Sequence, residues 1–266
     1  MLTAPALPTP LPSPLIPIRP IAATPPRQRV AAAATPSNAA RIAETLKLLA
    51  EVLQPQRRLV HAGDVIYRAG ERFDCLHVLN SGMVKVVKLS ADGREQVVGL
   101  KFRGDWLGLD GIAPGAYGCD GIAMDTGEVW AVRYDQLMES VARHPELLMA
   151  LHSAMSLEIA RERESLMSVC TLPADARVAD FLRFIAESLA HRGLRTDQIT
   201  LRMTRAEIGN HLGLTLESVS RALSRLAKEG VIAFVEKGRR ELRIPDLQAL
   251  AGFVQRGLAR EPVVLQ

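Results

Sequence analysis

A short stretch near the end of the chain holds residue types that can read a nucleic acid. Between Met203 and Ile232 the sequence runs MTRAEIGNHLGLTLESVSRALSRLAKEGVI. If Thr215 starts a helix, Glu217, Ser220 and Arg221 fall on one face of it. Arginine can hold guanine O6 and N7 with two hydrogen bonds, and a carboxylate can accept one from the amino group of cytosine. A carboxylate among basic and hydroxyl side chains therefore predicts the reading of base edges, because phosphate binding alone asks only for cations.

Two short helices joined by a tight turn are predicted to position these side chains. Thr204 and Glu207 form a capping box that starts the first helix. Gly209 and Gly213 let the helices approach closely and turn sharply, and Thr215 caps the second helix. The second helix then has a packing face of Val219, Leu223 and Leu226 and a polar face of Glu217, Ser220, Arg221, Ser224 and Lys228. This pattern predicts a helix-turn-helix.

A basic wing is predicted to follow. The segment AFVEKGRRELRI gives two short β runs around Lys237 and Gly238, and its cations would lie along the phosphates. The predicted DNA-binding residues of this winged helix-turn-helix are Thr215, Glu217, Ser218, Ser220, Arg221, Arg225, Lys237 and Arg239. The alternative is a capped helical hairpin whose polar face meets only water. The glycines, the caps and the spacing of the apolar residues would then serve the fold alone and not DNA binding.

Short alternating runs occupy the region from Arg57 to Arg133. The run around Val84, Val86 and Leu89 leads into Asp92-Gly93, and a second run follows, which is the signature of a hairpin. Turn glycines recur along this region at Gly63, Gly70, Gly82, Gly93 and Gly104. The pattern predicts a small antiparallel barrel or jelly roll.

One long helix is predicted between Asp135 and Cys170, where no glycine occurs. Apolar residues recur there at helical spacing: Leu148, Leu151, Met155, Ile159, Leu166 and Val169. Glu162 interrupts this apolar stripe. In contrast, residues 1–40 hold 10 of the 16 prolines and no acidic or aromatic residue, which predicts a disordered tail that is either a simple extension or a docking segment.

The net charge of +4 is unevenly distributed over the 266 residues. The basic excess lies in residues 1–40 and from residue 171 onward, while the middle of the chain is acidic, which fits a nucleic-acid partner at the C-terminal end. Cys75, Cys119 and Cys170 are far apart, so neither a disulfide framework nor a zinc site is indicated. No apolar run has the length of a membrane span and no signal peptide is apparent, so we expect a soluble, cytoplasmic protein without a membrane partner.

The helix-turn-helix, the long helix and the β region together resemble the Crp/Fnr superfamily of bacterial transcription regulators, over roughly Leu53 to Leu250. Glu217-x-x-Ser220-Arg221 matches the recognition motif of the Fnr branch. The resemblance implies half-sites like TTGAT in an inverted repeat, double-stranded DNA and RNA polymerase as partners, and a homodimer formed through the long helix. The implied dimer interface comprises Leu148, Leu151, Met155, Ile159, Glu162 and Leu166.

Two departures from that family bear on the cofactor. No cysteine precedes Cys75, and Trp130 stands about where the oxygen sensors have a central cysteine, so an iron–sulfur cluster is not expected. The segment that would hold a cyclic phosphate, residues 104–128, contains no arginine, so a cyclic nucleotide is not expected either. The cysteines are either buried small hydrophobes or thiol redox sensors. A haem or metal ligand among His61, His77 and His144 is the other open alternative.

The resulting expectation is an α+β protein in five segments. These are a tail (1–40), a β-roll sensor domain like a cyclic-nucleotide-binding jelly roll (41–136), a dimerisation helix (137–170), a winged helix-turn-helix (171–250) and a C-terminal tail (251–266). We expect a homodimeric, sequence-specific transcription regulator. The alternative is a ligand-binding β-barrel module that acts through a protein partner. An enzyme is not expected, because the sequence has no nucleophile elbow, metal motif or phosphate-binding loop.

Overall fold

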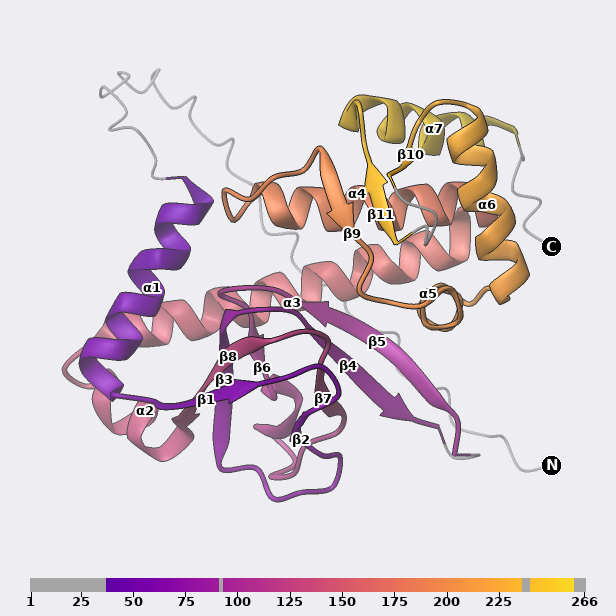
Figure 1. Ribbon diagram of the computed structural model, residues 1–266. Helices are drawn as coiled ribbons and strands as arrows, with labels where there is room; N and C mark the ends of the chain where they lie inside the picture. Colours follow the sequence, from indigo (N-terminus) through magenta and orange to yellow (C-terminus); the bar gives the residue numbers. More distant parts are fainter. Residues whose placement is uncertain (1–36, 91–92, 236–239, 261–266) are drawn as a thin grey trace, which may run out of the picture. The chain divides into compact units, whose positions relative to one another are not determined.

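Short strands separated by glycine turns form two four-stranded antiparallel sheets (Figure 1). The computed structural model describes residues 37–90, 93–235 and 240–260. One sheet has the order β1 (Gln56–Val60), β8 (Gly127–Arg133), β3 (Cys75–Ser81) and β6 (Trp106–Leu107), and β6 is followed by the 3-10 helix η1 (Leu109–Gly111). The other has the order β2 (Val65–Tyr67), β7 (Asp120–Ala123), β4 (Val84–Leu89) and β5 (Glu95–Lys101). The predicted β-roll is confirmed.

Strands β4 and β5 form the hairpin predicted around Gly93. Val84 pairs with Lys101 at the base of the hairpin, and Leu89 pairs with Glu95 near its tip. In its sheet β5 has β4 as its single neighbouring strand, so the other side of β5 is a sheet edge. Backbone N–H and C=O groups along such an edge need partners from outside the sheet.

Helix α1 (Asn38–Leu53) precedes the first strand and was not predicted. Ser37 caps it by accepting a hydrogen bond from the amide of Ala40 at 3.2 Å. Leu46 and Leu49 are buried in the core beneath it. The prediction that the tail extends to residue 40 is therefore wrong at its end, because residues 38–40 belong to this helix; residues 1–36 lie outside the described residues.

Two helices, α2 (Tyr134–Val141) and α3 (Pro145–Thr171), replace the single helix predicted from residue 137. Pro145 stands at the start of α3, where its missing amide hydrogen costs nothing, but it cannot continue a helix that comes before it. Leu147 and Leu151 pack in a buried cluster with Trp106 and Trp130 of the β-roll. The first two turns of α3 are thus fixed on the sheet.

The C-terminal part has the expected helix-turn-helix and wing, with an additional helix. Its elements are α4 (Ala174–Ala190), β9 (Gln198–Thr200), α5 (Arg205–Leu212), α6 (Leu216–Lys228), β10 (Ala233–Phe234), β11 (Glu241–Arg243) and α7 (Leu247–Arg260). Phe253 of α7 is 7% exposed and belongs to the core. The prediction of a tail from residue 251 is therefore wrong up to residue 260, because an apolar face of α7 packs on α4; residues 261–266 lie outside the described residues.

All described residues belong to one compact unit. One buried cluster includes Val97 and Phe102 of the β-roll together with Val178 and Phe181 of α4. The β-roll therefore shares apolar contacts with the DNA-binding part. Within the described ranges, no helix is both long and apolar enough to cross a lipid bilayer.

Candidate nucleic-acid interface

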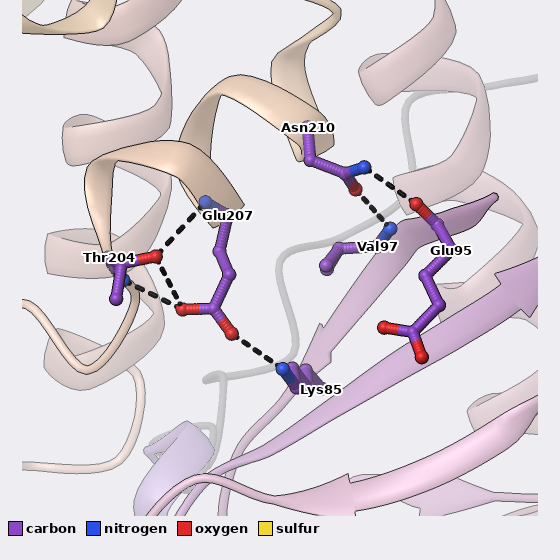
Figure 2. Close-up of polar contacts among 6 residues, drawn as sticks. All are labelled: Lys85, Glu95, Val97, Thr204, Glu207 and Asn210. Carbon is purple, nitrogen blue, oxygen red and sulfur yellow. Dashed lines mark hydrogen bonds and ion pairs between the residues drawn. The ribbon is translucent and has the colours of Figure 1, made fainter. Parts of the chain in front are cut away.

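The first helix of the motif, α5, begins with the capping box predicted from the sequence. The amide of Glu207 donates to Thr204 Oγ1 at 3.2 Å, and the Glu207 carboxylate accepts from the amide of Thr204 at 2.8 Å (Figure 2). Ile208 and Leu212 are buried on the opposite side of the helix. The cap sets the start of α5 and its apolar residues set its rotation.

Glycines at two positions allow the turn into α6. Gly213 adopts a φ of 65°, a left-handed conformation that favours glycine. A Cβ on Gly209 would lie 2.6 Å from the carbonyl oxygen of Leu214, so a larger residue would push the turn away from α5. Thr215 then caps α6 by accepting from the amide of Ser218 at 3.2 Å. The turn residues thus have the roles that the sequence predicted.

Helix α6 separates a packing face from a polar face. Val219, Leu223 and Leu226 are each 0% exposed. Glu217 and Arg221 are exposed and Ser220 is half-buried on the polar side. The predicted division of this helix is therefore confirmed, and its polar face can meet a ligand without any repacking of the core.

Arg221 is the cation best placed to reach a base on this face. It is exposed, and among the described residues it forms no ion pair. Its Nη2 lies 3.4 Å from the hydroxyl of Ser218, which itself contacts Thr215 Oγ1 at 3.1 Å. Glu217 lies in the first turn of α6, where the helix dipole favours a carboxylate. The first turns of the helix therefore present a carboxylate acceptor and a guanidinium group that forms no ion pair with the described residues.

Arg225 is paired with two carboxylates of its own domain. Its Nη1 donates to Asp175 at 2.7 Å and its Nε donates to Glu229 at 3.2 Å. These two carboxylates hold the guanidinium group against its own domain. Two of the five N–H donors of Arg225 are thus engaged within the domain, and its side chain is 47% exposed, so its predicted contact with DNA stays a prediction.

Arg177 of α4 is a positioning residue that the sequence analysis missed. Its Nη1 donates to the carbonyl of Leu212 at 2.8 Å, and its Nη2 donates to the carbonyl of Leu172 at 3.0 Å. It thus satisfies the free carbonyl groups at the ends of both α5 and α3. No local pattern signals this role, because the two acceptors come from separate helices.

The wing is present as a small sheet in the order β10-β11-β9. Ala233 pairs with Arg243 and Phe234 pairs with Leu242. The two wing residues predicted to contact phosphates, Lys237 and Arg239, lie outside the described residues.

The apolar stripe of α3 is largely exposed. Met155 is 36%, Ile159 46% and Leu166 64% exposed; Leu148 is half-buried, and Glu162 is exposed in line with them. Leu151 is the exception at 4% exposed, because it packs into the β-roll core. The prediction that Leu151 lies in the dimer interface is wrong for that reason, while the rest of the stripe has its side chains available.

A groove of about 690 Å³ separates α3 from the β-roll. Its charged lining residues are Lys88, Lys101, Asp110, Glu158 and Glu162. Lys101 is already paired with Glu158. The lining thus contains no arginine and more carboxylates than cations, and Lys88 is its lysine without an ion pair to a described residue, so it lacks the bidentate cation that best holds a cyclic phosphate.

Burial disfavours reactive thiolates at two cysteines. Burial of the Cys75 thiol is the main cause that raises its pKa to about 11, and the nearby carboxylate of Asp74 raises the pKa further. Burial likewise raises the pKa of Cys119 to about 11, with a contribution from Asp110. Cys170 is exposed on α3. The thiol-sensor alternative therefore has no support from Cys75 or Cys119, because the thiolate is the reactive form.

Comparison with known proteins gives consistent matches at both ends of the chain. The Crp-like helix-turn-helix domain matches residues 176–253, and the cyclic nucleotide-binding domain matches residues 57–144. Transcriptional activator protein Anr of Pseudomonas protegens is 32% identical over 209 residues, which is 79% of this chain and 85% of Anr. Transcriptional regulatory protein btr of Bordetella pertussis is 31% identical over 200 residues, 75% of this chain and 83% of btr.

Solved structures agree with the sequence relatives. The structure of FixK2 from Bradyrhizobium japonicum superposes with a TM-score of 0.67 at 26% identity, covering 75% of this chain and 96% of FixK2. The regulator TTHB099 of the CRP family from Thermus thermophilus gives a TM-score of 0.61 at 25% identity, covering 76% and 98% of the two chains.

Proposed function

The chain belongs to the Crp/Fnr family of transcription regulators, whose members bind DNA through a helix-turn-helix, and we propose that it reads an Fnr-type inverted repeat, TTGAT-N4-ATCAA, as a homodimer. The observation that carries this proposal is the exposed face of α6, where Glu217, Ser220 and Arg221 lie together. This face is directed away from the core, so it can enter a major groove as a rigid body.

The chemistry of these three residues supports sequence reading. The guanidinium fork of Arg221 can bind O6 and N7 of a guanine, and the carboxylate of Glu217 can accept from a cytosine amino group. Ser220 lies between them and fits a thymine or phosphate contact. A protein-docking surface would not require a carboxylate and a free guanidinium group at this spacing, which disfavours the alternative of a β-barrel module that acts only through a protein partner.

The exposed stripe on α3 supports the homodimer. An inverted repeat requires two reading helices related by a two-fold axis. Met155, Ile159 and Leu166 would pair with the same residues of a second copy, which would remove their exposed apolar surface from water. We propose this stripe, without Leu151, as the dimer interface.

We further propose that the protein senses its signal without an iron–sulfur cluster. The chain has three cysteines, whereas such clusters are usually held by four cysteine thiolates. They lie on different elements, with Cys75 on β3 and Cys170 on α3. An RNA polymerase contact remains a prediction from the family resemblance, and a cytoplasmic location remains a prediction from the sequence.

Fluorescence anisotropy with a labelled TTGAT-N4-ATCAA duplex tests the proposed function. We expect binding that is at least about 10³-fold tighter than to a scrambled duplex at the same salt concentration, as for other specific DNA-binding proteins. Changing the spacer from four to seven base pairs should abolish the preference, because the two reading helices are fixed in the dimer. Equal affinity for the intact and scrambled duplexes would contradict the proposal.

A further inference from the structure

The edge of strand β5 that has no neighbouring strand forms hydrogen bonds with helix α5 of the helix-turn-helix. The amide of Val97 donates to Asn210 Oδ1 at 2.6 Å, and Asn210 Nδ2 donates to the carbonyl of Glu95 at 2.7 Å (Figure 2). A single side-chain amide thus supplies the donor and the acceptor that a neighbouring strand would otherwise provide. Asn210 is on α5, and 113 residues separate it from Val97 in the sequence.

Neighbouring residues strengthen this contact, which we call the β5 latch and define as Asn210, His211 and Glu207 of α5 with their partners on β4 and β5. His211 Nδ1 lies 3.0 Å from the carbonyl of Val97, and the side chain of Gln96 donates to the backbone carbonyl of Asn210. The carboxylate of Glu207 accepts from Lys85 Nζ at 2.5 Å (Figure 2).

The Lys85–Glu207 ion pair is partly shielded from water. The two side chains are 19% and 30% exposed, respectively. Burial opposes ionisation of Glu207, but hydrogen bonds from Lys85 and Thr204 outweigh it and lower the pKa of this carboxyl group. Glu207 therefore stays charged at neutral pH, and one carboxylate both caps α5 and ties it to β4.

The β5 latch leaves the reading face free. Glu207, Asn210 and His211 are spaced i, i+3 and i+4, so they share one face of α5. Glu217 and Arg221 on the following helix are exposed while these bonds are formed. The latch therefore fixes the orientation of the reading helix and does not cover it.

The same strand lines the groove beside α3. Gln96 and Val97 of β5, and His211 of α5, border this groove together with Glu162 and Leu166 of α3. Any group that enters the groove therefore meets the strand that holds Asn210 and one member of the latch itself. Gln96, Val97 and His211 thus belong both to the groove lining and to the contact between β5 and α5.

We propose that Asn210 is a positioning residue for operator binding, which locks the helix-turn-helix on edge strand β5 in the orientation that the operator requires. This inference rests on the proposed function. A reading helix that is already held in place loses less orientational freedom when it binds, so a closed latch favours binding.

Hydrogen exchange and operator binding, measured on the same variants of the full chain, test this role. In Asn210→Ala, exchange of the β5 amides, including Val97, should speed up about fivefold, as expected for the loss of a typical hydrogen bond. Operator affinity should fall about fivefold or more, the lower end of typical couplings between sites. Asn210→Asp keeps the acceptor for Val97 but loses the donor to Glu95, so it should fall between wild type and Asn210→Ala in both measurements.

Asn80→Ala is the matched control. It removes an amide that donates to Glu128 at 2.6 Å within the other sheet, so it should leave β5 exchange and operator affinity unchanged. Thermal unfolding should show that every variant is folded. Unchanged exchange in Asn210→Ala would show that the latch does not form in solution, whatever the DNA result.

Two DNA results would overturn the positioning role. Faster exchange with unchanged or tighter operator binding would show that the latch does not set the reading orientation. If wild-type protein shows no preference for the operator, the proposed function fails and the positioning role fails with it, while the exchange experiment still reports on the contact itself.

Discussion

Arg225 on the reading helix α6 donates a hydrogen bond to Asp175 at the start of α4, with 2.7 Å between Nη1 and Oδ2. A second bond, to Glu229, keeps the guanidinium group on the surface of its own domain. A basic residue one turn beyond Arg221 is thus paired with carboxylates of its own domain. This pairing lowers the net positive charge that the middle of α6 presents to solvent.

Removing Asp175 should release that cation. In Asp175→Asn we expect Arg225 to gain access to phosphates, so affinity for random-sequence DNA should rise and the salt dependence should steepen by about one counterion. Discrimination between operator and random DNA should not improve, because phosphate contacts carry no sequence information. Anisotropy titrations at several salt concentrations measure both quantities. An unchanged salt slope in Asp175→Asn would show that Arg225 still does not contact the phosphates. The control is Asp180→Asn, which removes the partner of Arg183 and should leave the slope unchanged.

Arg221 should carry base discrimination. Arg221→Ala should lose about 1–3 kcal/mol of preference for the guanine of the half-site. Lys237→Ala on the predicted wing should instead weaken binding to all sequences alike and lower the salt slope by about one. Titrations with operator, guanine-substituted operator and random DNA separate the two effects. Equal losses on operator and random DNA for Arg221→Ala would remove α6 from the reading role.

Glu162 should weaken the proposed dimer. It is exposed in line with Ile159 and Leu166, so in a symmetric pair of α3 helices two carboxylates would approach each other. Glu162→Leu should tighten dimerisation by about 1–3 kcal/mol, because like charges that are partly removed from water oppose association. Sedimentation equilibrium measures the dimer constant. Glu164→Leu, on another face of α3, is the control, and an unchanged constant in Glu162→Leu would place this residue outside the interface.

Acid should destabilise the β-roll through His77. Burial, aided by Arg58, lowers the pKa of His77 from 6.5 to about 4, so the unfolded chain binds this proton more readily than the folded one. The contribution of neutral His77 to the free energy of unfolding is complete above pH 6.5, its pKa in the unfolded chain. This contribution decreases as the pH falls from 6.5 toward 4, and about 2 kcal/mol of it is lost at pH 5. His77→Phe, which can keep the stacking on Tyr67, should lose less stability between pH 7 and pH 5 than wild type in urea unfolding. As the control, His191→Gln at an exposed position should lose as much stability between pH 7 and pH 5 as wild type. An equal loss in His77→Phe would show that His77 does not cause the acid sensitivity.

The Lys101–Glu158 pair joins β5 to α3 and should respond asymmetrically to mutation. The side chain of Lys101 is 5% exposed, so Glu158→Ala would leave a buried ammonium group without its partner. We expect a loss of about 3 kcal/mol in the free energy of unfolding. Adding Lys101→Met should recover most of it, because an apolar side chain then fills the same space. Glu51→Ala, which breaks the exposed Lys47–Glu51 pair, should cost less than about 0.5 kcal/mol, and a similar cost for Glu158→Ala would contradict the prediction.

Local sequence rules were sufficient for the helix-turn-helix. The capping box at Thr204, the left-handed Gly213 and the buried positions of α6 each follow from a few neighbouring residues, and all agree with the structure. The β4–β5 hairpin is similarly local, because turn residues and alternation fix it.

Contacts between distant segments could not be predicted in the same way. Asp175 and Arg225 are 50 residues apart, and no periodicity connects them, so their ion pair was not foreseen. The apolar period of α3 was correctly recognised, yet it did not show that Leu151 is buried against the β-roll while Met155 is 36% exposed beside the groove. Helix α1 was missed because it begins within two residues of a proline-rich segment whose composition dominated the prediction.

The bond between Asn210 and strand β5 has a consequence for how the protein behaves in a crowded solution. An uncovered strand edge is a template on which another chain can pair, and it is a common starting point for aggregation. Here a helix covers that edge, and its side-chain amide takes up the Val97 N–H and the Glu95 carbonyl. The DNA-binding part thus protects the edge of the β-roll sheet from pairing with another chain. A fragment that ends after α3 would lack this cover, and it would expose β5 to every neighbouring copy.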